Sequence, residues 1–160
     1  MAREIERKFL LLNDHWRTLV SESIPMRQGY LSTTGVVSVR VRLEGERACL
    51  NLKSVRLGIS REEFEFPLPA GEAAEVLDRF CSARCVEKIR HLVPNGPHVW
   101  EIDEFSGANQ GLIVAEIELA AEDEDFIRPS WLGREVSHDA RYYNVCLIDA
   151  PYASWADPSA

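Results

Sequence analysis

Residues 4–9 of the chain read Glu-Ile-Glu-Arg-Lys-Phe, a run in which charged and apolar side chains largely alternate. Neighbouring residues of a β-strand point to opposite faces of the sheet, so residues two apart share a face. Glu4, Glu6 and Lys8 then lie on one face, while Ile5 and Phe9 lie on the other. The run predicts a strand with one ionised face and one apolar face.

The same period of two recurs along most of the chain. It predicts eight strands, over residues 4–12, 26–32, 36–44, 48–55, 60–68, 85–93, 98–105 and 111–121. Short turns at 33–35 and 44–46 join neighbouring strands as hairpins. We also expect one or two helical turns over 14–20, a helix over 70–83, and a tail of loop and short helix that includes 129–132 and 140–147. Strands joined in this way commonly close into an antiparallel barrel, with the helices packed outside.

Ionised side chains occupy one face of seven of the eight predicted strands, and their signs are largely sorted by strand. Acids dominate the first, seventh and eighth strands, and bases dominate the third and sixth. The later members are Arg40, Arg42, Lys53, Arg61, Glu63, Glu65, Lys88, Arg90, Glu101, Asp103, Glu116 and Glu118. In the plainer alternative, these faces are simply wet and the opposite faces pack on the core.

A barrel with the ionised faces inward would carry an acidic arc and a basic arc across one tunnel. Charges in such a place must be paired, hydrated or bound to a ligand. Carboxylates suit Mg²⁺ or Mn²⁺, and Arg and Lys suit phosphate oxygens. A polyphosphate that carries a divalent cation would use both arcs at once.

The composition indicates one globular domain over residues 1–160. The chain has 46% hydrophobic and 28% charged residues, a net charge of −8 and a pI of about 5.0. This acidic balance argues against a nucleic-acid partner, which usually needs a basic surface. No apolar run reaches the roughly 18 residues of a membrane span, and the N-terminus does not resemble a secretory signal, so we expect a cytoplasmic protein. The four cysteines form no C-x-x-C pair, which favours small buried thiols.

Glu4-Ile5-Glu6-Arg7-Lys8 resembles the ExExK signature of the CYTH, or triphosphate tunnel metalloenzyme, superfamily. One such five-residue motif is weak, but further matches follow in the order of the family and cover residues 2 to about 147. They are Gln28 to Leu31, Arg40 to Arg42, Lys53, Arg61 to Glu65, Lys88 to Arg90, Trp100 to Asp103, Glu116 to Glu118 and Asp139 to Asn144.

The resemblance implies an eight-stranded antiparallel barrel that is open as a tunnel, of mainly β class. It implies that Glu4, Glu6, Glu116 and Glu118 bind Mg²⁺ or Mn²⁺, with Asp103 as a further ligand or supporting partner. The implied phosphate-binding residues are Lys8, Arg40, Arg42, Lys53, Arg61, Lys88 and Arg90. The implied catalytic residues are Glu4, Glu6, Lys8 and Lys88, and Tyr30, Glu63, Glu65, Glu101 and Arg141 are expected to line the tunnel.

The start of the chain looks most like the small bacterial tripolyphosphatases. The resemblance therefore implies a metal-dependent hydrolase that splits inorganic triphosphate into pyrophosphate and phosphate. Other members of the superfamily leave two alternatives open: hydrolysis of thiamine triphosphate or a nucleoside triphosphate, and a class IV-type adenylate cyclase. A non-catalytic polyphosphate-binding module, which is a different class of function, also stays open. The expected partner is a small polyphosphate, with neither nucleic acid nor membrane, and a homodimer stays open.

Overall fold

The computed structural model describes residues 2–33, 36–54 and 58–156, and its strands pair in antiparallel fashion throughout. The strands are β1 (Ala2–Leu11), β2 (Glu22–Ser32), β3 (Val37–Glu44), β4 (Arg47–Ser54), β5 (Ser60–Leu68), β6 (Cys85–Asn95), β7 (His98–Phe105), β8 (Ile113–Glu118) and β9 (Leu132–Glu135). The α-helices are α1 (Ala70–Phe80) and α2 (Cys146–Asp149), and 3₁₀ turns span His15–Leu19, Gly107–Asn109, Ala140–Tyr142 and Tyr152–Ser154.

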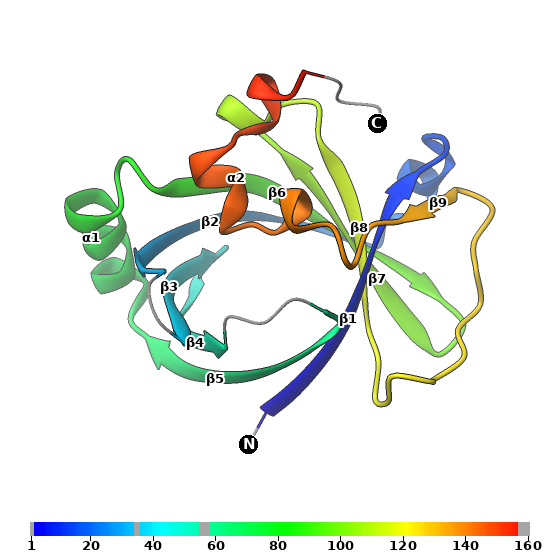
Figure 1. Ribbon diagram of the computed structural model, residues 1–160, viewed down its shortest axis with the longest axis horizontal. Coiled ribbons are helices and arrows are strands. Elements are labelled where there is room, and N and C mark those ends of the chain that lie inside the picture. The colour runs from blue at the N-terminus through cyan, green and yellow to red at the C-terminus, as the bar shows by residue number, and fades with distance from the viewer. Residues whose placement is uncertain (1, 34–35, 55–57, 157–160) are drawn as a thin grey trace.

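Strand β1 closes the sheet into a barrel, because it pairs with a different strand at each end. Near its start Glu4 lies opposite Arg61 of β5, and further along Lys8 lies opposite Glu116 of β8. The ring runs β1-β5-β4-β3-β2-β6-β7-β8 and returns to β1 (Figure 1). The predicted eight-stranded antiparallel barrel is confirmed. The hairpin at Gly45 is confirmed as well, since Gly45 has the positive φ of 56° that this kind of tight turn requires.

Several predicted boundaries were wrong. Strand β2 begins at Glu22 rather than at residue 26, and α1 ends at Phe80. The tail was expected to hold only loop and short helix, yet Leu132–Glu135 forms β9. This strand has four residues, too few for a readable alternation, and it forms because β1 extends beyond β5 and offers that edge at Phe9 and Leu11. Residues 34 and 35 of the predicted turn and residue 55 of the predicted strand lie outside the described residues.

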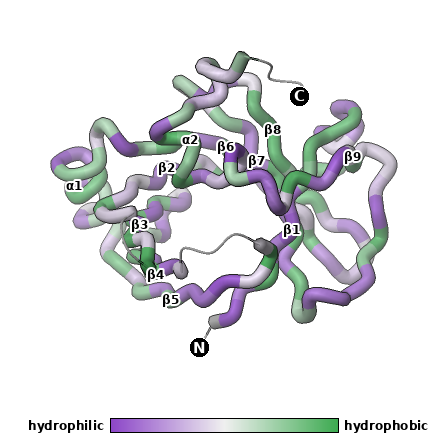
Figure 2. The backbone as a smooth tube through the Cα atoms, in the orientation of Figure 1, coloured by the Kyte–Doolittle hydropathy of each residue, from purple (hydrophilic) through white to green (hydrophobic). Residues whose placement is uncertain are grey.

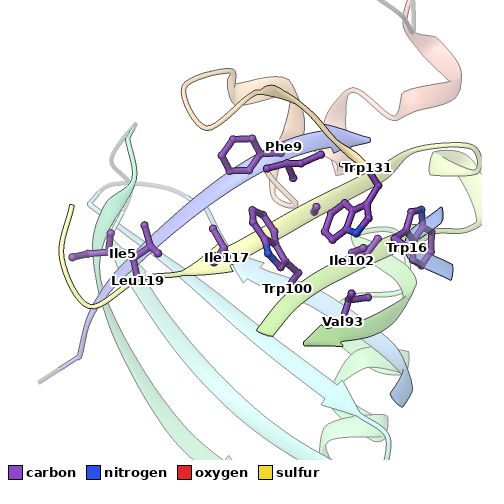
Figure 3. Packing of buried hydrophobic residues seen from close by; sticks show 11 residues of the cluster. Ile5, Phe9, Trp16, Val93, Trp100, Ile102, Ile117, Leu119 and Trp131 are labelled. Carbon is purple, nitrogen blue, oxygen red and sulfur yellow. The ribbon is translucent and has the colours of Figure 1, made fainter. Parts of the chain in front are cut away.

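The main apolar core lies outside the barrel wall. Phe9, Trp100 and Trp131 stack edge to face, with ring centroids 5.6 Å apart for Phe9–Trp100 and 5.5 Å for Trp100–Trp131 (Figure 3). Ile5 and Ile117 belong to the same cluster and are buried. Hydrophilic and hydrophobic positions follow one another along the barrel strands (Figure 2). On β1, β7 and β8 the apolar face therefore packs outward into this core, which leaves the ionised face for the lumen.

The C-terminal segment packs against the barrel through a second apolar cluster. Tyr142 and Leu147 lie among Val86 of β6, Phe105 of β7 and Val114 of β8. In Figure 1 this orange-to-red segment lies beside the ring of strands, with α1 on the outside of β3 and β4. The segment is thereby placed where some of its side chains reach the lumen.

Candidate active site

A cavity of about 600 Å³ lies within the ring of strands. Fifteen of the seventeen side chains that the sequence predicted for the site line it: Glu4, Glu6, Lys8, Tyr30, Arg40, Arg42, Lys53, Arg61, Glu63, Glu65, Lys88, Arg90, Glu101, Glu116 and Glu118. Every strand of the ring contributes at least one of them. Charges that are scattered through the sequence therefore converge on one enclosed volume, as expected for a tunnel rather than for a wet outer face.

Lys8 lies at the centre of the acidic arc. Its ammonium group donates to the carboxylates of both Glu6 and Glu116, and its side chain is almost fully buried. Burial lowers the pKa of Lys8, but Glu116 and Glu6 outweigh this and raise it above its ordinary value. Burial likewise raises the pKa of Glu6, while Lys8 and Lys53 hold it well below its usual range. Both groups are therefore charged at neutral pH.

Glu4 behaves differently from Glu6, although the two lie on the same face of β1. Burial and the nearby negative charge of Glu6 raise the pKa of Glu4 to about 7, and Lys53 opposes the shift only in part. Lys53 pairs with Glu4 and also lies 3.5 Å from a carboxylate oxygen of Glu63. The acidic arc therefore holds more negative charge than its lysines neutralise, which favours an added cation.

The raised pKa of Glu4 gives a testable pH dependence. Its ordinary value is 4.5, so between about pH 4.5 and 7 the folded state keeps a proton that the unfolded state has lost. Ionised Glu4 thus destabilises the fold as pH rises, by on the order of 2–3 kcal/mol once pH exceeds 7. We expect Glu4→Gln to gain stability relative to wild type between pH 5 and pH 8.

Urea unfolding of both proteins in EDTA at the two pH values measures this change. Because the other carboxylates are common to both proteins, their contributions largely cancel in the comparison. A stability difference between the two proteins that stays constant from pH 5 to pH 8 would contradict the raised pKa.

Asp103 was predicted as a metal ligand or a supporting partner, and the structure buries it against Lys88 and Arg90 of the neighbouring strand. Its exposure is 0%, it does not line the cavity, and its two oxygens accept hydrogen bonds from Lys88 and Arg90. Arg90 binds it in a bidentate fork, with both N···O distances at 2.8 Å. Burial raises the pKa of Asp103, but Arg90 and Lys88 lower it to about 2. Asp103 thus holds the two bases in position.

Arg141 also lies outside the cavity lining. Its guanidinium binds the Asp139 carboxylate at 2.7 Å and lies over the rings of Trp155 and Tyr142. The Asp139 carboxylate also accepts from the Arg141 backbone, two residues on. This local pairing directs Arg141 away from the lumen, so the expectation that it lines the tunnel is not met.

The basic arc contains a neutral residue that the sequence analysis did not single out. Asn51 of β4 is fully buried, accepts from Arg40 Nε at 3.3 Å, and donates to Glu63 at 2.7 Å and Glu65 at 2.5 Å. Arg42 lies on the same arc and binds Glu65 at 2.8 Å. Asn51 shares its strand face with Lys53, so the alternation could have revealed it. An amide is an ambiguous signal, however, because it is common on wet faces.

A family model described as the CYTH domain matches residues 2–144 of this chain. The chain belongs to the CYTH family. An inorganic triphosphatase from Acetivibrio thermocellus is 41% identical over 157 residues, which cover 98% of this chain and 100% of that protein. An inorganic triphosphatase from Nitrosomonas europaea is 38% identical over 149 residues, which cover 90% of this chain and 95% of the relative.

A solved structure extends the likeness to the fold. The crystal structure of an inorganic triphosphatase superposes with a TM-score of 0.65 at 34% identity, covering 92% of this chain and 95% of that one. Membership of this family, in its triphosphate tunnel type, implies that a divalent cation and a small polyphosphate substrate bind to the protein.

The donor chemistry of the acidic arc fits a divalent cation. Glu4, Glu6, Glu116 and Glu118 all line the cavity, and carboxylate oxygens are the ligands that hard cations prefer. Within residues 2–33, 36–54 and 58–156, no three acidic, His or Cys side chains stand close enough together to hold an ion by themselves. Here Lys8 and Lys53 occupy three of these carboxylates in ion pairs. The four carboxylates thus suit a divalent cation, and the ammonium groups of Lys8 and Lys53 would compete with it for their oxygens.

Proposed function

We propose that this CYTH protein hydrolyses inorganic triphosphate to pyrophosphate and phosphate with the help of a divalent cation. One observation carries the proposal: a single cavity is lined both by carboxylates and by the seven predicted phosphate-binding side chains, namely Lys8, Arg40, Arg42, Lys53, Arg61, Lys88 and Arg90. A pure polyanion-binding module would gain nothing from the carboxylates. The two inorganic triphosphatases that share 41% and 38% of its residues support the same reaction.

The reaction adds water to a terminal phosphorus and breaks the bridging P–O bond, so that pyrophosphate leaves. Phosphoryl transfer is accelerated mainly by positioning and by stabilisation of charge. Arg40, Arg42 and Arg90 present planar groups that bind phosphate oxygens in pairs. Lys8 and Lys88 supply compact positive charge, and Asp103 holds both Lys88 and Arg90 in place. Together these side chains would hold the triphosphate in place and neutralise the negative charge of the leaving pyrophosphate.

We assign the cation to the acidic arc, with Glu4, Glu6, Glu116 and Glu118 as its protein ligands and Mg²⁺ or Mn²⁺ as the metal. When bound, such an ion polarises phosphate oxygens and lowers the pKa of a water molecule. Glu101 and Glu63 also line the cavity and balance the charge of Arg90 and Arg40. Arg61 lies over the ring of Tyr143 at 4.3 Å and completes the set of phosphate-binding residues.

The proposal extends to the setting of the enzyme. We expect residues 1–160 to act as one domain in the cytoplasm, without a nucleic-acid partner. A measurement of the molecular mass in solution would distinguish a monomer from a homodimer. No helix in the described part of the chain is long and apolar enough to cross a membrane.

Selectivity for the bare phosphate chain tests the proposal. The Arg and Lys side chains of the cavity suit phosphates, and the described residues form no comparable set for a nucleobase, a ribose or a thiazole. We expect kcat/KM for inorganic triphosphate to exceed that for ATP by at least about tenfold, which equals roughly 1.4 kcal/mol of transition-state binding. Phosphate release from inorganic triphosphate, ATP and thiamine triphosphate, with Mg²⁺, Mn²⁺ or EDTA, measures the ratio.

Each alternative function has its own result in this panel. Equal efficiency on ATP would indicate a nucleoside site, and a cyclic product from ATP would indicate a cyclase. Binding of inorganic triphosphate without any phosphate release would indicate a binding module. Activity that persists in EDTA would contradict the need for a cation.

A further inference from the structure

Strand β2 is the neutral sector of the cavity wall. The other seven strands of the ring each bring at least one ionised side chain to the cavity, whereas the described residues of β2 that line it are Gln28 and Tyr30. Both are nearly fully buried, with exposures of 1% and 4%. Buried polar groups need hydrogen-bond partners, so the partners of these two side chains indicate what this sector can bind.

Strand β2 lies across the barrel from the acidic arc. In the ring order it is four strands from β1 in either direction, through β5-β4-β3 or through β8-β7-β6. Glu4 and Glu6 of β1 therefore face the lumen from one side, and Tyr30 faces it from the opposite side. A phosphate chain held between the two arcs would pass between these walls.

The hydroxyl of Tyr30 already receives a hydrogen bond. Gln28 Nε2 donates to it at 3.2 Å, and Arg40 lies directly opposite Tyr30 on the neighbouring strand. The Gln28 amide donates through its nitrogen, so it uses the phenol oxygen as an acceptor and leaves the phenol's own proton unused. Among the described residues, this hydroxyl donates to no acceptor.

We propose that Tyr30 is a further substrate-binding residue, whose phenolic O–H donates to a phosphate oxygen from the wall opposite the cation site. The inference rests on the proposed triphosphatase function and adds a neutral, directional donor to the charged set. Gln28 holds the phenol oxygen, so the donor is oriented before the substrate arrives. A neutral donor binds one oxygen without adding positive charge near Arg40.

Tyr30→Phe tests the assignment, because it removes the hydroxyl and keeps the ring. A hydrogen bond to a charged acceptor is worth enough to raise KM for inorganic triphosphate about tenfold when it is lost. We expect this rise with Mg²⁺ present, and a change in kcat of less than about threefold, because the bond is made to bound substrate as well as to the transition state.

Tyr143→Phe is the matched control. Tyr143 also lines the cavity, but its hydroxyl donates to the Ser137 carbonyl at 2.7 Å and accepts from the Gly58 amide at 3.3 Å. Its proton is therefore already used, and the phenyl ring that lies beneath Arg61 is kept. We expect KM of this variant to stay within about twofold of wild type.

The outcomes separate this inference from the proposed function. If wild type hydrolyses triphosphate and Tyr30→Phe has an unchanged KM, the substrate-binding role of Tyr30 is overturned, while the proposed hydrolase function is retained. If wild type does not hydrolyse triphosphate, the proposed function fails. Calorimetric binding of inorganic triphosphate to both proteins then still decides on Tyr30: about tenfold weaker binding supports it, and equal binding overturns it.

A second measurement covers a Tyr30→Phe variant that does not fold. Tyr143→Phe protein, labelled with ¹³C at tyrosine Cζ, retains Tyr30 as its one described tyrosine that lines the cavity. Addition of inorganic triphosphate should shift one tyrosine resonance, because a phenol that begins to donate changes its Cζ environment. If no resonance moves at saturating triphosphate, Tyr30 does not contact the substrate.

Discussion

Glu6→Gln is expected to lower kcat for inorganic triphosphate by at least about 100-fold, because it removes a carboxylate proposed to hold the cation that stabilises developing charge. The amide has nearly the shape of the carboxylate but carries no negative charge. Glu6 lines the cavity, is ionised at neutral pH, and shares Lys8 with Glu116. Its replacement removes a proposed cation ligand and leaves Lys8 with one carboxylate. Phosphate release with Mg²⁺ measures the loss.

The matched control for this variant is Glu62→Gln. Glu62 is exposed, does not line the cavity, and lies on β5, the strand that pairs with the first residues of β1. The same loss of one negative charge from the whole protein should leave its kcat within about twofold of wild type. If Glu6→Gln were as active as Glu62→Gln, the cation would have to be held by other residues.

Asp103→Asn is expected to destabilise the folded protein by about 3–5 kcal/mol, the usual cost of removing one partner from a buried ion pair. Lys88 and Arg90 are both nearly fully buried, and Asp103 accepts hydrogen bonds from each. An amide in its place cannot offset two positive charges and turns one oxygen acceptor into a donor. Urea unfolding at pH 7 in EDTA measures the change.

Asp78→Asn is the control, because Asp78 also pairs with an arginine, but on the surface. Its oxygen lies 2.6 Å from Arg27, and 65% of its side chain is exposed. An exposed pair of this kind contributes less than about 1 kcal/mol. If Asp103 served only as a metal ligand, its variant would match this control in EDTA and lose stability relative to wild type only when the cation is added.

The alternation of side chains determined the faces of the strands before any tertiary contact was known. Glu4, Glu6 and Lys8 are two residues apart, and a strand places such residues on one face whatever it pairs with. The same local rule grouped Arg40 with Arg42, and it holds in the structure, where all five line one cavity. Eight strands joined mainly by hairpins commonly close into an antiparallel barrel, and the family resemblance implied the same fold, so the barrel could also be predicted from the sequence.

The partners within the wall depend on register and ring closure, which bring together residues far apart in the chain. Lys8 lies opposite Glu116, and Arg90 lies opposite Asp103, so Lys8 pairs with proposed cation ligands and Asp103 pairs with Lys88 and Arg90. Ring closure likewise places Tyr30 of β2 across the cavity from Glu4 and Glu6 of β1. Strand alternation is a local property of the chain, whereas the hydrogen-bond partner of a side chain depends on which strands become neighbours in the barrel. Only the tertiary structure therefore decided these roles.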